Sequence, residues 1–553
     1  MKGIAVRTVL SILLLITFSR GIPAAEEFDL VLRGGRIVDG TGAPWYRGDI
    51  AIRGGRIVGL GRLTEASEKR AIDASGLVVA PGFIDMMGQT AAPFLTDPRS
   101  ATNLLSQGIT TINCGEGVSD APLVGEAATK SGWSSMSEFF ARLDATGMPI
   151  NTVQTVGHTQ VRRVVLGDVD RRASPAELDR MREHVREAMR AGAVGVSTAL
   201  IYPPAVYAPT EEIIELTKVA GEFGGGYYTH MRNEGDRLLE AIDEALAIGA
   251  GAGTRVHIFH LKAAGQQNWG KMEQAVARIK AARAAGQQVT ADVYPYINNG
   301  LGASAFIHPR HAAEGPVALR RKLDDPDARA EIRREMESSA EYENWYRHAG
   351  FNWNRVVLGT MTGNEYGQLN GLTIATIADR LSKDTWDVFF DAAKSDAFAM
   401  PQTMSEANLI LAMRQEFTSF CTDVGPAGGS RIASHPRAAG SFPKILSRYV
   451  RELGVLSLEQ AVAKLTSVAA NDLLIQDRGR LAVGLPADLV VFDIARIADR
   501  ATFGDPLANS EGIRFVIVNG EVVLDEGQLT GVRPGRVLRR AGSVRERSRE
   551  SGR

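Results

Sequence analysis

Histidines and carboxylates stand at the ends of several predicted strands in this sequence. The apolar runs that precede them finish on Glu116, His230, His260 and Asp423. Because a parallel α/β barrel places its chemistry at the carboxyl ends of its strands, we expect these side chains to meet at the barrel mouth. Two imidazoles and one carboxylate suit a zinc-like ion that keeps one position open for water. A second carboxylate can accept the proton of that water.

Each of these histidines, taken alone, has a simpler interpretation. A single histidine at a strand end is more often a hydrogen-bonded core residue than a metal ligand. Four such polar residues on four strand ends favour a site instead. Strand alternation also turns the residues two positions earlier into the barrel, and these include Cys114 and Cys421. Alternation places His257 on the opposite side, so we expect it to be structural and to face the helices.

The elements that must position these residues alternate between apolar strands and amphipathic helical patterns. This alternation is typical of βαβ units in a parallel sheet. Eight strands are predicted, which is the number that a (β/α)₈ barrel of the TIM type needs. They are the segments 77–85, 108–116, 150–158, 194–202, 225–230, 255–260, 288–296 and 417–423.

The two ends of the chain have a different pattern, of short strands separated by glycine turns. Residues 26–80 and 480–541 are predicted to form one small β-sandwich domain. Residues 81–479 form the barrel, and an inserted subdomain around residues 300–414 is expected because that connection is too long for a simple loop. The polar residues 542–553 are predicted to be a disordered tail.

Composition excludes several classes of function. The 553-residue chain has a formal net charge of −1. It therefore lacks the excess positive charge that would favour binding to nucleic acid or to an anionic membrane surface. The expected partner is a small molecule, and nothing indicates the oligomeric state. Only two cysteines are present, which excludes a disulfide framework.

The N-terminus is predicted to be a secretory signal peptide, residues 1–25. Lys2 and Arg7 precede an apolar run at 9–18, and small residues follow at 23–25, with cleavage expected near Ala24 or Ala25. A retained membrane anchor is the alternative, but the run is too short to span a bilayer comfortably. We therefore expect an exported protein, periplasmic or secreted.

Several longer motifs resemble those of one enzyme family, the N-acyl-D-amino-acid deacylases (D-aminoacylases) of the amidohydrolase superfamily. The resemblance runs from about residue 28 to about residue 538 and covers both sheet segments and the barrel. The motifs are THMRNE at 229–234, FHLK at 259–262, NWGK at 268–271, ADVYPY at 291–296, HPRAAGSFPKIL at 435–446 and DRGRLAVGLPADLVVFD at 477–493.

This resemblance implies roles for individual residues. His230 and His260 match the two histidine ligands of a tightly held zinc ion, and Asp423 matches the catalytic aspartate. Arg437 matches the arginine that pairs with the substrate α-carboxylate, which a planar guanidinium can bind with two parallel hydrogen bonds. The residues that match the lining of the substrate site are Lys262, Tyr202 and Tyr294.

The sequence departs from the family pattern at two places. Met87 and Gln89 stand where the superfamily usually has two histidines after the first barrel strand, and neither is a good zinc ligand. We therefore expect one divalent ion, zinc, rather than two. In the second strand the family has a zinc-ligating cysteine; with a one-residue deletion, Glu116 takes its position. Cys114 is the alternative ligand, two residues earlier.

Together these observations predict metal-dependent hydrolysis of the amide bond of N-acyl-D-amino acids. The D preference rests on the resemblance alone. Two alternatives remain open. One is a cyclic-amide hydrolase of the hydantoinase or dihydroorotase type, which the HMRNE, DVYPY and HPR motifs disfavour. The other is a catalytically silent barrel that only binds a ligand, which the missing histidine pair suggests and the retained ligands with Asp423 disfavour.

Overall fold

Eight parallel strands form the barrel in the computed structural model. They are β6 (Phe83–Asp85), β7 (Ile109–Cys114), β8 (Asn151–Gln154), β10 (Gly195–Ala199), β11 (Gly226–His230), β12 (Val256–Ile258), β13 (Val289–Val293) and β17 (Thr418–Phe420). The structure describes residues 27–63, 67–361, 365–428 and 434–540. The predicted signal peptide and the predicted C-terminal tail lie outside the described residues.

Hydrogen bonds between neighbouring strands close the ring. Strands β6, β7 and β8 pair in parallel, and β10, β11, β12, β13 and β17 pair in that order. Val194 N donates to Gln154 O at 2.8 Å, and Met86 N donates to Phe420 O at 3.4 Å, which links the two groups at both edges. The predicted barrel fold is confirmed by this arrangement together with the structural similarities described below.

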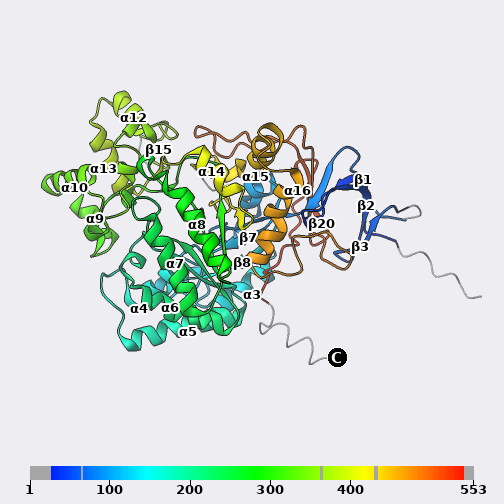
Figure 1. Ribbon diagram of the computed structural model, residues 1–553, viewed down its shortest axis with the longest axis horizontal. Coiled ribbons are helices and arrows are strands. Elements are labelled where there is room, and N and C mark those ends of the chain that lie inside the picture. Colours follow the sequence, from blue (N-terminus) through cyan, green and yellow to red (C-terminus); the bar gives the residue numbers. More distant parts are fainter. Residues whose placement is uncertain (1–26, 64–66, 362–364, 429–433, 541–553) are drawn as a thin grey trace, which may run out of the picture.

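Amphipathic helices surround the barrel, as Figure 1 shows for the region from α4 to α8. Helix α5 (Pro175–Ala191) is defined by its ends: Ser174 and Glu177 form a capping box, and Gly192 ends the helix with a φ of 118°. Its buried residues, among them Met181, recur at helical spacing. The other helices of this layer include α4 (His158–Leu166), α6 (Thr210–Glu222), α7 (Leu238–Ala252) and α8 (Lys271–Ala284). Among the described residues, no helix has the length and apolar character needed to cross a membrane.

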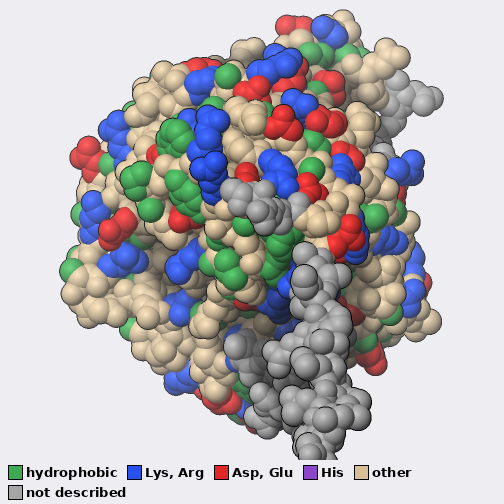
Figure 2. All heavy atoms as spheres, turned by 90° about the vertical axis from the view of Figure 1, so that its right-hand side faces the viewer, with side chains coloured by type: hydrophobic (Ala, Val, Ile, Leu, Met, Phe, Trp, Pro, Cys, Tyr) green, Lys and Arg blue, Asp and Glu red, His purple; other side chains and the backbone are tan. Residues whose placement is uncertain are grey.

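Strands from both ends of the chain form one nine-stranded sheet. It joins β1 (Leu30–Ile37), β2 (Tyr46–Arg53), β3 (Arg56–Gly61), β4 (Ala71–Asp73) and β5 (Val78–Pro81) to β18 (Leu489–Phe492), β19 (Ile513–Val518), β20 (Glu521–Asp525) and β21 (Gln528–Leu529). The two ends meet where β5 and β18 pair antiparallel. On the side of the molecule seen in Figure 2, Lys and Arg side chains are interspersed with Asp and Glu, in keeping with a net charge near zero.

The segment between β13 and β17 carries a small layer of its own. It contains a three-stranded sheet of β14 (Leu301–Gly302), β16 (Phe398–Pro401) and β15 (Val356–Gly359), with the helices α9 (Pro316–Lys322), α10 (Pro326–Ser338), α12 (Ile374–Leu381) and α13 (Thr385–Ser395). In Figure 1 these helices project at the upper left, away from the nine-stranded sheet. Their core is aromatic; Trp353 stacks on Tyr346 and Phe389.

The expectation that His257 faces the surrounding helices was wrong. Its ring lies 5.9 Å from that of Tyr228 and 5.6 Å from that of Phe259, two residues of the apolar cluster inside the barrel. Strand β12 ends at Ile258, and His260 has a φ of 36°, so strict alternation does not continue from His260 back to His257. Cys421 belongs to the same inner cluster, whereas Cys114 packs in the larger cluster that the barrel shares with its helices.

Candidate metal centre and active site

Two glycines shape the turn that carries Glu116 beyond the end of β7. Gly115 and Gly117 both have left-handed backbones, with φ of 99° and 67°. A Cβ on Gly117 would lie 2.6 Å from the backbone nitrogen of Ala199, and one on Gly115 would lie 2.7 Å from the carbonyl oxygen of Thr155. Only glycine fits both positions. The turn therefore holds Glu116 close to the neighbouring strand ends.

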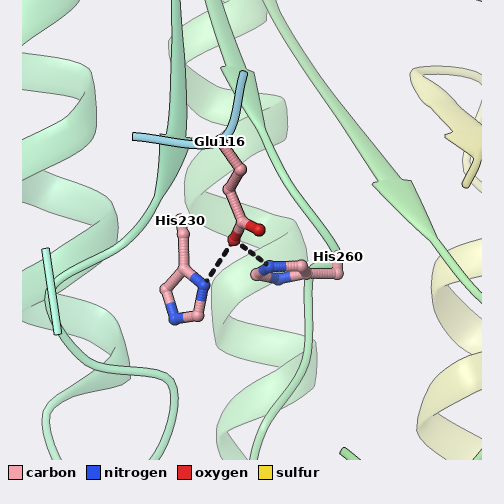
Figure 3. Close-up of side chains that lie close together, drawn as sticks. All are labelled: Glu116, His230 and His260. Atoms are coloured by element: carbon pink, nitrogen blue, oxygen red, sulfur yellow. Dashed lines mark hydrogen bonds and ion pairs between the residues drawn. The ribbon is translucent and has the colours of Figure 1, made fainter. Parts of the chain in front are cut away.

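Glu116 meets the two predicted histidine ligands at the barrel mouth. Its Oε1 atom lies 2.8 Å from Nδ1 of His230 and 3.1 Å from Nε2 of His260, and Figure 3 shows the carboxylate placed between the two rings. The rings contact each other edge to face, with centroids 4.5 Å apart. One ligand atom from each of the three residues lies within 4.8 Å of the others. The geometry brings together atoms from three different strand ends.

A buried ion pair contacts the two histidines on the side away from Glu116. Lys262 Nζ donates to Oε1 of Glu234 at 2.5 Å, and these atoms lie 2.7 and 2.9 Å from Nδ1 of His260. Glu234 also lies 3.6 Å from Nε2 of His230. Both histidines therefore face Glu116 on one side and Glu234 on the other.

Charges set the protonation of the cluster. Burial alone would raise the pKa of Glu116, but hydrogen bonds with His230 and His260 lower it well below its usual range. Burial likewise opposes ionisation of Glu234, and the charge of Lys262 lowers its pKa overall. Burial and Lys262 lower the pKa of His260, yet Glu234 and Glu116 outweigh them and raise it to about 10. The two carboxylates are thus anions that attract positive charge.

Asp423 and Arg437 form a second buried pair beside the cluster. Nη1 of Arg437 lies 2.6 Å from Oδ2 of Asp423, and the guanidinium lies 4.7 Å from the ring centroid of Tyr294. Burial raises the pKa of Asp423 even though Arg437 opposes the shift. The side-chain amide of Gln89 donates to Oδ1 of Asp423 at 2.9 Å and to Oε2 of Glu116 at 2.7 Å, and so links the two groups.

Three residues of this group have left-handed backbones. Gln89, His260 and Asp423 have φ of 59°, 36° and 53°. Such conformations cost on the order of 1–3 kcal/mol each for residues other than glycine, and they persist where surrounding contacts hold them. One such contact is visible: the backbone nitrogen of His260 donates to Oδ1 of Asp292 at 2.7 Å, while Oδ2 of Asp292 lies 2.8 Å from His257.

The group opens into a cavity of about 500 Å³. The predicted Tyr202, Lys262 and Tyr294 all line it. The other residues of the two clusters that line it are Gln89, Glu116, His230, Glu234, His260, Asp423 and Arg437. Tyr202 stands edge-on to His230, with centroids 5.7 Å apart. Trp345 and Phe398, from the segment between β13 and β17, form part of the wall. Cys114 is buried and is not among the lining residues.

The donor set fits a divalent ion of the zinc type. Two imidazoles and a carboxylate are typical zinc ligands, and three protein ligands leave a position for water or substrate. Glu234 contacts His260 on the ring nitrogen that faces away from Glu116 (2.9 Å), as carboxylates do behind metal-ligating histidines. His230, His260 and Glu116 would hold the ion.

Comparison with known proteins assigns the chain to a family. The family described as "Amidohydrolase family" matches residues 70–524. N-acyl-D-glutamate deacylase of Alcaligenes xylosoxydans xylosoxydans is 36% identical over 530 residues, which cover 94% of this chain and 98% of that protein. The chain belongs to the D-aminoacylase family of amidohydrolases.

Solved structures of this amidohydrolase family agree with the assignment. The structure of N-acyl-D-glutamate deacylase from Bordetella bronchiseptica, complexed with zinc and a phosphonate mimic of the tetrahedral intermediate, is 33% identical, with a TM-score of 0.78; it covers 93% of this chain and all of that one. A D-aminoacylase studied for its binuclear metal centre, with one-metal activation and second-metal attenuation, is 32% identical, with a TM-score of 0.77 and the same coverage.

Sequence reasoning missed several parts of this amidohydrolase site. Glu234 lies in the THMRNE motif, but no periodic pattern indicates that the loop after β11 returns its carboxylate to His260. Gln89 was interpreted only as a lost ligand, whereas the structure makes it a hydrogen-bond donor. Asp292 stands in the predicted ADVYPY motif, and its contact with His260 could be found only from the strand pairing of β12 with β13.

Proposed function

We propose that this protein hydrolyses the amide bond of N-acyl-D-amino acids and releases a carboxylate and a free D-amino acid. The observation that carries the proposal is the convergence of Glu116, His230 and His260 beside the Asp423–Arg437 pair in one cavity. The relatives named above act on N-acyl-D-amino acids, which supports the D configuration of the substrate.

The proposed chemistry uses one divalent ion, zinc. When bound, such an ion polarises the scissile carbonyl and lowers the pKa of a water molecule. Asp423 accepts a proton from the attacking water and later delivers it to the leaving amine nitrogen. Burial raises the pKa of Asp423, which favours the protonated form that the second transfer needs. The hydrogen bond from Gln89 and the ion pair with Arg437 keep this carboxylate oriented.

Arg437 is proposed to bind the α-carboxylate of the substrate. The ion pair with Asp423 engages Nη1, and Nε is buried with no hydrogen-bond partner among the described residues. A guanidinium has five N–H donors, so donors are left for an anionic group of the substrate. Tyr294, under the guanidinium, and the neighbouring Lys262 and Tyr202 line the space in which that substrate would lie.

The residues that follow β6 support a count of one ion. Met87 is buried in the apolar cluster inside the barrel, and Gln89 supplies an amide rather than an imidazole. Neither offers a strong ligand for a second ion. The one-metal activation described for the related D-aminoacylase is compatible with activity at this count.

A panel of substrates tests the proposal. The zinc-loaded protein is expected to hydrolyse N-acetyl-D-amino acids, with acidic and apolar side chains compared in parallel, and to leave the L enantiomers intact. Removal of zinc by a chelator should abolish turnover, and zinc should restore it. Hydrolysis of hydantoin or dihydropyrimidine rings in place of linear amides would contradict it in favour of a cyclic-amide hydrolase. Binding of N-acetyl-D-amino acids without turnover would indicate a silent binding protein.

A further inference from the structure

The side-chain amide of Gln89 lies between the two carboxylates of the site. Nε2 donates to Oε2 of Glu116 at 2.7 Å and to Oδ1 of Asp423 at 2.9 Å. A primary amide has two N–H donors, and both are used here. Glu116 follows β7 and Asp423 follows β17, more than 300 residues later in the chain. One side chain from the segment after β6 therefore ties two other strand ends together.

This arrangement divides the oxygens of both carboxylates. With Oε2 held by Gln89, Glu116 turns Oε1 toward His230 and His260. With Oδ1 held by Gln89, Asp423 turns Oδ2 toward Arg437. Two anions that share one donor are kept close without a cation between them, because each accepts a hydrogen bond from the same neutral group.

The backbone at Gln89 is built for this position. Its φ of 59° is unusual for a residue other than glycine. Two backbone hydrogen bonds with the β7 region hold the segment: Gly115 N donates to Gln89 O at 2.8 Å, and Gly88 N donates to Asn113 O at 2.6 Å. A strained conformation that neighbouring contacts maintain at a site points to a function for the residue that adopts it.

We propose that Gln89 is a positioning residue for Asp423 and takes the place of a cation between Glu116 and Asp423. The inference rests on the proposed function, in which Asp423 moves the proton. The two N–H groups of the amide point their positive ends at the oxygens that a second ion would need, so an ion could bind there only by displacing them. Gln89 thus makes single-ion occupancy a property of this chain.

Two substitutions separate positioning from exclusion. Gln89→Leu replaces the side chain by an apolar one of similar size and so removes both N–H donors. The zinc content should stay at one ion per chain and KM should change little, while kcat should fall about 10- to 100-fold. Gln89→Glu adds a third carboxylate, so equilibrium dialysis against excess zinc should give two ions per chain where the wild type gives one. Gln160→Leu is the matched control: Gln160 is a buried glutamine on α4 that donates to Pro122 O, and its loss should change neither zinc content nor kcat.

The outcomes decide each half of the proposal. Wild-type kcat in Gln89→Leu would overturn the positioning role. Two zinc ions in the wild type, or one in a folded Gln89→Glu protein, would overturn the exclusion of a second ion. Failure of the proposed function would look different: the wild type itself would not hydrolyse N-acyl-D-amino acids, while the zinc counts of the two variants would still report on Gln89.

Discussion

Two buried clusters in this molecule use the same residue types for different ends. In the first, Glu212 on α6 contacts His158 at 2.9 Å and Arg162 at 2.7 Å, both on α4. In the second, Glu116 contacts His230 and His260 at the barrel mouth. Both pair one carboxylate with imidazole, and both are largely removed from solvent.

The difference lies in what balances the carboxylate. Beside Glu212 the guanidinium of Arg162 supplies a permanent positive charge, and the cluster joins two helices. Around Glu116, ligand-type atoms from three strand ends lie within 4.8 Å of one another and open into a cavity of about 500 Å³. A histidine next to a glutamate is therefore not evidence of a site by itself; convergence of several ligand atoms at a cavity is.

Removing each glutamate gives the largest contrast. Glu116→Ala should lose zinc and activity together while the protein stays folded. Glu212→Ala should keep the zinc site but lose about 3–5 kcal/mol of unfolding free energy, because Arg162 would be left buried without its partner. Metal analysis and urea unfolding of both variants measure the contrast; Glu212→Gln is the milder second variant if the alanine protein does not fold. A Cys114→Ala protein that loses zinc while Glu116→Ala retains it would assign the ligand to Cys114 instead.

The next effect concerns the proton carrier. Asp423→Asn keeps the shape of the side chain and removes the base, so zinc content should be unchanged while kcat falls about 10²- to 10⁴-fold. The matched control is Asp396→Asn. Asp396 lines the same cavity, but its carboxylate accepts a hydrogen bond from the hydroxyl of Ser304, so this variant should retain most of the turnover. Steady-state kinetics with N-acetyl-D-amino acids measure both; an unchanged kcat in Asp423→Asn would remove Asp423 from the mechanism.

Arg437 tests recognition of the substrate. Replacing the substrate carboxylate by a primary amide removes one charge and the paired geometry, so kcat/KM should fall about 30- to 1,000-fold. Arg437→Lys should recover only part of the loss seen in Arg437→Ala, because an ammonium cannot form two parallel hydrogen bonds. If the wild type hydrolyses the acid and the amide equally well, the ion pair with Asp423 is the whole role of Arg437.

The sequence predicted the strand ends well and the loops beyond them poorly. Each of the eight barrel strands overlaps a predicted segment, because buried parallel strands are continuous apolar runs. Glu116, His230, His260 and Asp423 could be singled out because each interrupts or ends such a run. Glu234 and Gln89 could not, since their contacts depend on how the loops turn after the strands end. His257 was misplaced because alternation fails where His260 adopts a left-handed backbone.

A third buried carboxylate, Asp472, also lies beside a histidine, and its ionisation should have a smaller effect, on the pH dependence of stability. It lies 3.6 Å from His257, and burial raises its pKa to about 6 although His257 opposes the shift. A raised folded-state pKa means that the folded protein holds this proton more tightly than the unfolded chain. Its contribution to stability is therefore lost as the pH rises from about 4 to about 6.

Chemical unfolding across this pH range tests the shift. The wild type should lose about 2 kcal/mol more unfolding free energy between pH 4 and pH 7 than Asp472→Asn, which cannot ionise there. Taking the difference between the two proteins cancels the other titrating groups. Parallel curves for the two proteins would show that Asp472 ionises at its ordinary pKa in the fold.

Titration of zinc into the metal-free protein tests the central claim most directly, because it links the ion, its ligands and the hydrolysis of N-acyl-D-amino acids in one measurement. Activity toward N-acetyl-D-amino acids should rise linearly and reach its plateau at one equivalent of zinc, and the Glu116→Ala protein should show no such rise over the same range. Full activity without metal, or a plateau only at two equivalents, would contradict a single ion held by Glu116, His230 and His260.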